Sequence, residues 1–128
     1  MTAVLVPGEA TGEVVVLESP LSFWGGFDPV TGEITDRSHP QHGVSLAGKI
    51  VVMGHGRGSS SSSAVLAESL RLGTGPAALV LGEADQILVT GALVAHLLYE
   101  AACPVVVASM PPGASGIWRV SGAGLESV

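Results

Sequence analysis

The sequence predicts an α/β domain in which short strands alternate with helices, and three observations favour that class. Hydrophobic residues make up 47% of the chain and aromatic residues only 4%, so the core is expected to be aliphatic. The 18 glycines and 8 prolines indicate many tight turns and disfavour a helical bundle. Apolar segments typical of strands alternate with segments of helical spacing. We expect residues 1–128 to form a single domain without internal repeats, because a chain of this length can bury one sizeable core.

The first part of the chain is expected to contain two strands and a long loop. Residues 2–6 and 13–18 have strand character, the second because valines occupy positions 14–16. The glycines and proline between them allow a hairpin. Residues 19–48 are rich in glycine and proline and too long for a plain connection, so we expect an ordered loop that carries function.

The remainder is expected to alternate between strands and helices. Residues 49–53 (KIVVM) predict a buried strand, a glycine turn follows, and residues 64–71 have helical spacing that Gly73 ends. The later elements are expected to be strands at 77–81, 87–90, 104–108 and 117–120, with a helix over 92–101 and a Gly/Ser tail.

Charge and cysteine content exclude several classes of protein. Five Lys and Arg against eleven Asp and Glu give a net charge of −6, and an acidic surface repels nucleic-acid phosphates. No apolar run approaches the ~20 residues of a membrane span, and the N-terminus does not resemble a signal peptide, so we expect a cytoplasmic protein with no membrane partner. Cys103 is the single cysteine, so this chain is expected to hold neither a disulfide nor an iron–sulfur cluster. The excess of apolar residues over what one small core hides favours a partner surface.

A glycine turn carries the strongest local chemistry. The segment GHGRG occupies residues 54–58 and is followed by serines at 59–63. Closely spaced glycines let the backbone approach a ligand, and the amides that open the next helix can cradle a carboxylate or phosphate. The spacing matches neither a P-loop nor a dinucleotide fingerprint. Donors that stabilise an anion also stabilise an alkoxide, so Ser59 could act as base or nucleophile. The alternative is that the serines only cap and solvate the helix start, with Arg57 capping it or exposed.

Several separate motifs resemble one family. They are SFWGGFDPVTGEITDRSHPQHGVSLAGKIVVMGHGRGSSSSSAVLAESLR, the following TGPAALVL, and the DQIL and GA segments, spread over residues 8–107. Together they resemble the small, swivelling-domain subunit of aconitase X. The resemblance implies a β/β/α domain that docks on a larger catalytic subunit carrying an iron–sulfur centre. It also implies a dehydratase: bacterial members act on cis-3-hydroxy-L-proline and archaeal members on mevalonate 5-phosphate.

The resemblance also implies site residues. The serine after the Gly-Arg-Gly turn is the family's proposed proton acceptor, which here is Ser59. Removing a proton from the carbon next to a carboxylate is difficult, so the base must be held among hydrogen-bond donors and away from water. Serines alone follow Gly58 where aconitase places an arginine, so that partner for a second carboxylate is missing. The substrate-binding residues implied are Arg57, Gly58 and Ser60 at the turn, and Ser22, Gly25 and Gly26 in the FWGG loop.

The expected substrate is a small carboxylate. The FWGG-to-HPQHG segment and the serine run resemble the bacterial enzymes more than the archaeal ones, in which we expect a threonine soon after the reactive serine. A phosphorylated substrate would call for a second cationic group. The sequence places none beside Arg57, since the other cations are Arg37, Lys49, Arg71 and Arg119. We therefore expect cis-3-hydroxy-L-proline, with mevalonate 5-phosphate as the alternative.

Two other function classes remain open. Residues 87–107 also resemble the swivelling phosphohistidine domain of phosphotransfer enzymes, but Leu93 fills the place of the carrier histidine and His96 lies about one turn later. A free-standing anion-binding or regulatory module is the other alternative. Among the remaining residues, His39 and His42 are expected to be structural and not a metal site, and His55 an exposed turn residue. Trp24 is expected to be a core or interface anchor.

Overall fold

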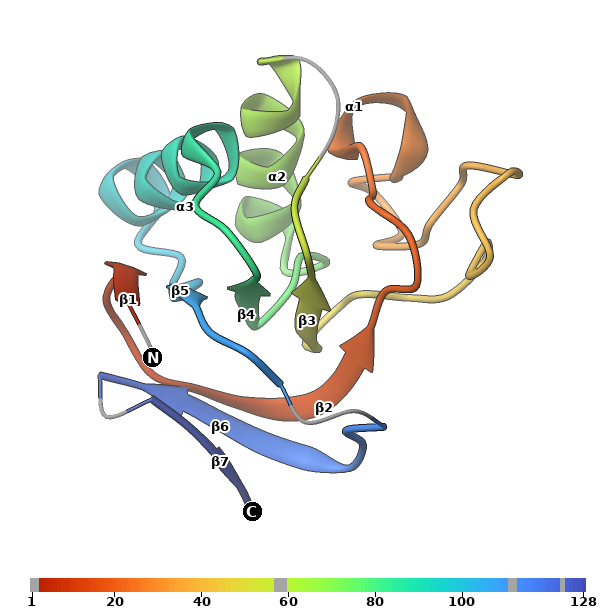
Figure 1. Cartoon of the computed structure of the whole chain (residues 1–128). Coiled ribbons are helices and arrows are strands. Elements are labelled where there is room, and N and C mark those ends of the chain that lie inside the picture. The colour runs from red at the N-terminus through yellow and green to blue at the C-terminus, as the bar shows by residue number, and fades with distance from the viewer. Residues whose placement is uncertain (1–2, 57–59, 111–112, 123) are drawn as a thin grey trace.

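The computed structural model describes residues 3–56, 60–110, 113–122 and 124–128 (Figure 1). Within these ranges, seven strands form one mixed sheet in the order β1-β5-β4-β3-β2-β6-β7. The strands are β1 (Ala3–Val6), β2 (Ala10–Val16), β3 (Ile50–Met53), β4 (Ala78–Leu81), β5 (Val105–Val107), β6 (Ile117–Ser121) and β7 (Gly124–Ser127). The helices are α1 (Phe23–Gly26), α2 (Ser61–Leu72) and α3 (Gln86–Tyr99). None of the described helices is long and apolar enough to cross a membrane.

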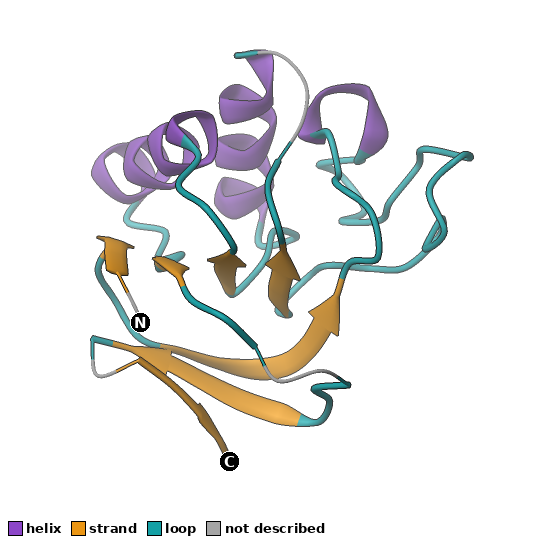
Figure 2. Ribbon diagram, viewed as in Figure 1, coloured by secondary structure: helices purple, strands orange, loops and turns teal. Residues whose placement is uncertain are grey.

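Strand β2 bends the sheet into a half-barrel. Its first residues, from Ala10 to Glu13, pair antiparallel with β6, whereas Val14 to Val16 pair parallel with β3. The bend brings a neighbouring loop very close, because a Cβ atom on Gly12 would lie 2.5 Å from the carbonyl oxygen of Gly48. The result is three layers: α2 and α3, the parallel strands, and the β2–β6–β7 ribbon on the opposite side (Figures 1 and 2).

The central strands are buried on both faces, which explains their nearly continuous aliphatic sequences. On β4, Leu79 and Leu81 pack in the cluster that includes residues of α2 and α3. Ala78 and Val80 alternate with them and pack with Val120 of β6 inside the half-barrel. The predicted α/β class with a β/β/α architecture is therefore confirmed, and the aliphatic core is the reason that so few aromatic residues suffice.

The structure corrects three expectations for individual elements. Residues 2–6 and 13–18 do not form a hairpin, because β1 pairs with β5 and β2 pairs with β3 and β6. Residues 87–90 are not a strand: they belong to α3, whose N-cap Asp85 accepts hydrogen bonds from the backbone N–H groups of Ile87 and Leu88. The Gly/Ser tail contains a further strand, β7, which pairs antiparallel with β6.

Candidate functional site

The carboxyl ends of β3 and β4 leave the sheet side by side. The backbone N–H of Gly82 donates to the carbonyl oxygens of Met53 and Gly54, at 3.0 and 2.9 Å. A Cβ atom on Gly82 would lie 2.9 Å from the same Gly54 oxygen, so only glycine fits this approach. Ligands of parallel α/β sheets generally bind beyond this edge.

The segment after β3 passes against the start of α3. A Cβ atom on Gly56 would lie 2.7 Å from Oδ2 of Asp85. The other oxygen, Oδ1, accepts from the N–H groups of Ile87 and Leu88 at 2.9 and 3.1 Å, and thereby caps the helix. A side chain at position 56 would therefore crowd the carboxylate that caps α3, which explains the glycine at this position.

The expected catalytic turn is described only at its two ends. Arg57, Gly58 and Ser59 lie outside the described residues, so their roles as anion donors and base remain predictions. The chain enters the turn from Gly56 and leaves it at Ser60, which is exposed and precedes α2. Ser60 makes no side-chain cap, and its carbonyl oxygen accepts from both the N–H and the Oγ of Ser63, at 3.2 and 2.8 Å.

Ser62 is the residue of the serine run that sequence reasoning missed. Its side chain is only 2% exposed, although the alternative considered for the run was a solvated helix start. Helix α2 begins at Ser61, three residues earlier than the spacing predicted. This start places Ser62 four and eight residues before the buried Leu66 and Leu70, on one face of the helix. That i, i+4, i+8 relationship was the available signal.

The FWGG loop lies against the beginning of α2 (Figure 1). Phe23 is fully buried and packs edge-to-face on Phe27, with ring centroids 4.9 Å apart. The backbone N–H of Trp24 donates to Ser62 Oγ at 3.1 Å, and its carbonyl oxygen accepts from Ser22 Oγ at 2.7 Å. The hydrogen bond from Trp24 thus holds the loop that contains Ser22, Gly25 and Gly26 against the first turn of α2. Their contact with substrate remains a prediction.

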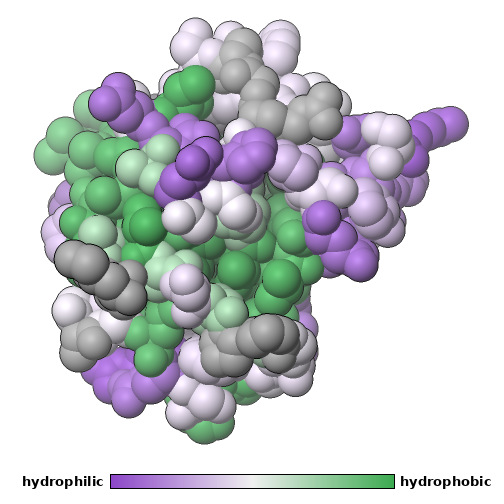
Figure 3. Space-filling view, in the orientation of Figure 1, coloured by the Kyte–Doolittle hydropathy of each residue, from purple (hydrophilic) through white to green (hydrophobic). Residues whose placement is uncertain are grey.

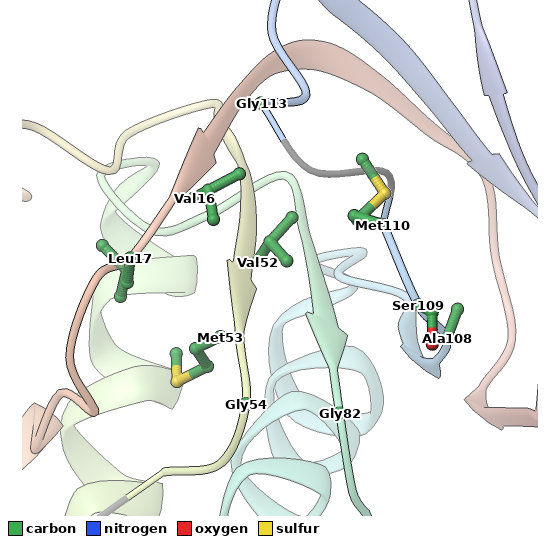
Figure 4. A pocket seen from close by; sticks show the side chains of 10 residues that line it. All are labelled: Val16, Leu17, Val52, Met53, Gly54, Gly82, Ala108, Ser109, Met110 and Gly113. Carbon is green, nitrogen blue, oxygen red and sulfur yellow. The ribbon is translucent and has the colours of Figure 1, made fainter.

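A hollow of about 320 Å³ opens beside the carboxyl ends of β3 and β4 (Figure 4). The side chains of Val16, Val52 and Met110 line it from β2, β3 and the segment after β5. Gly54 and Gly82 also border it, so it adjoins the segment that leads to the glycine turn. The residues of the FWGG loop are not among its lining, and neither is Ser60.

His39, His42 and His55 have structural or surface positions. His39 is buried, its Nδ1 accepts from the Gln41 N–H at 3.0 Å, and its Nε2 therefore donates to the carbonyl oxygen of Ser19 at 3.0 Å. His42 is exposed, as is His55, whose ring nitrogen bonds the carbonyl oxygen of Gly56. Within the described ranges, no three His, Cys, Asp or Glu side chains form a candidate metal site.

Cys103 does not fit an iron–sulfur ligand. Its side chain is 2% exposed, and burial raises the pKa of the thiol to about 12, so the thiolate that a cluster requires is disfavoured. The donors of the described residues therefore do not suit such a group.

Helix α3 also weakens the phosphocarrier alternative. The helix opens at Gln86 and not at residue 92, so neither Leu93 nor His96 stands at its beginning. Its first turn, QILV, contains no histidine that could accept a phosphoryl group. His96 is exposed near the end of the helix.

Half-barrel curvature, two helices on one face and a serine-rich connection after β3 together define a β/β/α swivelling domain. The chain belongs to the aconitase X swivel domain family, whose profile matches residues 2–114. It is 45% identical over 101 residues to a cis-3-hydroxy-L-proline dehydratase of Pseudomonas aeruginosa, a match covering 79% of this chain but 17% of that protein. It is 43% identical over 93 residues to the phosphomevalonate dehydratase small subunit of Thermococcus onnurineus, covering 73% of this chain and 72% of that subunit.

A solved structure supports the same assignment. The crystal structure of Thermococcus kodakaraensis aconitase X in its holo-form superposes with a TM-score of 0.84 at 36% identity, covering 96% of this chain and 92% of that chain. The chain thus spans about a sixth of the hydroxyproline dehydratases that it matches, and most of the small subunits. Relatives of both kinds contain this domain, either within a long chain or as a subunit.

Proposed function

We propose that this chain is the swivel subunit of an aconitase-X-type dehydratase, a hydro-lyase of the cytoplasm. The observation that carries the proposal is the GRGSSSSS segment, residues 56–63, which follows β3 and runs into the first turn of α2 in a domain of this family. Dehydratases are named among both the single-chain and the small-subunit relatives. The alternative of a free-standing binding module has no comparable support among these relatives.

Ser59 is proposed to accept the proton that the substrate loses. Dehydration breaks a C–H bond beside a carboxylate and a C–O bond on the neighbouring carbon, and the hydroxyl leaves as water. The proton acceptor must face the first carbon, and the charge that develops there needs donors already in place. Arg57 and the amides of Gly58 and Ser60 are the proposed donors, and the N-terminus of the twelve-residue helix α2 adds a favourable dipole.

A larger subunit is proposed to complete the site and to carry any iron–sulfur cluster. The small-subunit relatives support a partner by their names. Surface composition gives independent support, because large apolar side chains are exposed in the second half of α3. These residues are Leu93, Leu97, Leu98 and Tyr99. The left side of the molecule, where α3 lies in Figure 1, is largely green in Figure 3.

The proposed substrate is cis-3-hydroxy-L-proline, which loses water across C2 and C3 to give the enamine Δ2-pyrroline-2-carboxylate. Transfer of a proton from the nitrogen to C3 then gives the cyclic imino acid Δ1-pyrroline-2-carboxylate. Identity does not separate it from mevalonate 5-phosphate, because the two kinds of relatives are 45% and 43% identical to this chain. The distribution of cations favours the substrate with one anion. Lys49, Arg71 and Arg119 are each paired with glutamates away from the turn.

Among the arginines and lysines that the structure describes, Arg37 is the one whose position is compatible with the phosphorylated alternative. It follows Asp36, whose backbone N–H donates to the carbonyl oxygen of Gly26 in the FWGG loop. Arg37 thus lies next to a residue that contacts the FWGG loop, one of the two segments proposed to bind substrate.

The test is a side-by-side assay of both compounds on the complex purified from the native host with its large subunit. We expect turnover of cis-3-hydroxy-L-proline and essentially none of mevalonate 5-phosphate. Preference for the phosphorylated compound would overturn the substrate assignment and leave the dehydratase proposal intact. No turnover of either compound by an intact complex would count against the dehydratase proposal itself.

A further inference from the structure

Trp24 combines an exposed side chain with a firmly held backbone. Its indole is 59% exposed, whereas the preceding Phe23 is fully buried and anchors the loop in the core. Both backbone polar groups of Trp24 bond to serine hydroxyls, the N–H to Ser62 and the carbonyl to Ser22. Holding a large apolar side chain in water gains nothing for the fold, so the arrangement indicates a contact made by the indole.

The two serines hold Trp24 from different directions. Ser22 lies in the same loop, and its own carbonyl oxygen also accepts from the N–H of Gly26, which closes the short turn. Ser62 lies 38 positions further along the chain and in another element. The bond to Ser62 is therefore the one that fixes where the loop stands relative to α2.

Ser62 suits this task because its own position is fixed. The side chain is almost completely buried in the first turn of α2, next to the loop. An alanine would fill nearly the same space and have a higher helix propensity, so packing alone does not require the hydroxyl. The hydroxyl oxygen supplies the acceptor for the Trp24 N–H, a group that is partly buried and costly to leave unpaired.

Chain connectivity links this contact to the proposed chemistry. Ser62 comes two residues after Ser60 and three after Ser59, within the same short segment. The bond thus ties the FWGG loop to the segment that carries the proposed base. Movement of the loop relative to α2 would move the indole relative to the substrate.

We propose that Ser62 is a positioning residue that holds Trp24 beside the start of α2, where the indole packs on the carbon skeleton of the carboxylate substrate. The inference rests on the proposed function for its substrate and on the two hydrogen bonds for its geometry. A flat indole face provides apolar contact to a small ring and removes water from one side of it. The carboxylate of the substrate would bind at the glycine turn.

The geometric part can be tested on this chain alone by fluorescence. The chain has two tryptophans, so Trp118→Phe leaves Trp24 as the only indole. In that background, Ser62→Ala removes the acceptor, and we expect lower steady-state anisotropy and stronger quenching by iodide. Ser62→Thr keeps a hydroxyl and should retain most of the original anisotropy.

Ser69→Ala is the matched control. Ser69 is also buried in α2, but its hydroxyl donates to the carbonyl oxygen of Leu66 within the same helix. This change removes a buried hydroxyl from the same helix and should leave the anisotropy of Trp24 unaltered. Equal anisotropy in Ser62→Ala and in the parent, or an equal decrease in Ser69→Ala, would overturn the positioning role of Ser62.

The substrate part is tested on the assembled enzyme. We expect Trp24→Ala to raise KM by ~10-fold with a smaller change in kcat, since an apolar contact binds ground and transition states alike. Ser62→Ala should raise KM in the parent but hardly at all in the Trp24→Ala background, because it then positions nothing. Additive effects would overturn the coupling of the two residues.

The remaining outcomes distinguish contact of the Trp24 indole with the substrate from contact with the large subunit. Unchanged KM together with weaker binding of the large subunit in Trp24→Ala would make the indole an interface anchor and overturn the substrate contact. Lack of dehydratase activity in the unaltered complex would contradict the proposed function. The anisotropy measurements bear on the Ser62 contact regardless of that result, so the two failures can be distinguished.

Discussion

Gly91 of α3 crosses Ser63 of α2 so closely that a Cβ atom on Gly91 would lie 2.7 Å from the carbonyl oxygen of Ser63. Leu66 also lies near, with its side-chain carbons 3.2 Å from the same position. The contact involves the first turn of α2, the turn that follows the glycine loop and contains Ser62. Close packing of the helices at this point therefore fixes the helix end on which the proposed site depends.

Replacement of Gly91 by alanine is expected to destabilise the protein despite alanine's higher helix propensity. Propensity favours the change by about 1 kcal/mol, but the carbonyl oxygen opposite belongs to the backbone and can yield only if a helix shifts. Such overpacking costs ~1–3 kcal/mol, so we expect a net loss that lowers the urea midpoint. Thr90→Ala, one position earlier and exposed, is the control and should be neutral or slightly stabilising.

An unchanged or higher midpoint for Gly91→Ala would show that α2 and α3 can separate at no cost. The close crossing would then not be what holds the start of α2.

The thiol of Cys103 gives the fold a component of stability that depends on pH. Burial raises its pKa from 9.0 to about 12, so the folded state keeps the proton longer than the unfolded state. A raised pKa stabilises the fold below the unfolded-state value, and this contribution is lost as pH rises from about 9 toward 12. Urea unfolding of the parent and of Cys103→Ala, each at about pH 8 and about pH 10.5, measures this contribution. The quantity compared is the difference in unfolding free energy between the two proteins at each pH.

Other groups titrate in the same pH range, but both proteins contain them, so their contributions cancel in the difference. Cys103→Ala should be less stable than the parent at the lower pH, because the substitution leaves a small cavity. The difference in unfolding free energy between the two proteins should become smaller at the higher pH. A difference that stays constant would mean that the thiol ionises equally in the folded and unfolded states.

Strand and helix identity could be predicted from sequence where local patterns agree with tertiary packing. The aliphatic segments around residues 50–53 and 78–81 are strands because both of their faces are buried. The segment at 87–90 contains similar residues, yet it is helical because Asp85 caps it and the run continues to Tyr99. A short apolar run has no periodicity that separates these cases, so the cap was the informative residue.

The pairing of β1 was beyond local reasoning. A turn region follows β1, but its partner β5 lies about 100 residues further along the chain. Such pairing is decided by how helices α2 and α3 cross between parallel strands, and not by the residues of the nearest turn. Ser62 differs from β1 in this respect. Five successive serines look alike, but the spacing of Ser62 from Leu66 and Leu70 distinguishes it once the helix is extended back to Ser61.

The purified chain alone is expected to bind no iron–sulfur cluster and to show no dehydratase activity. It has one cysteine, and that residue is buried with a raised pKa, whereas a cluster takes several thiolates. Iron and sulfide analysis, the visible spectrum and turnover should all be negative for the chain, and activity should appear when the large subunit is added. A coloured and active preparation of this chain by itself would disprove the proposed division between the subunits.

Ser59→Ala is expected to lower turnover in the assembled enzyme by ~10²–10⁴-fold, the range typical of losing a positioned acid or base. Thermal stability and binding of the large subunit should change little, because the substitution removes one hydroxyl from the turn before α2. Ser61→Ala is the control: it makes the same chemical change at an exposed position of α2 and should keep nearly full turnover.

The control matters because the serine run offers several hydroxyls within a few residues. Loss of activity in Ser59→Ala alone would assign the base to that position, since a general effect on the helix start would appear in Ser61→Ala as well. Turnover near that of the parent in Ser59→Ala would instead move the base elsewhere. Ser60 would then be the next candidate, because it is exposed and its side chain makes no cap to the helix.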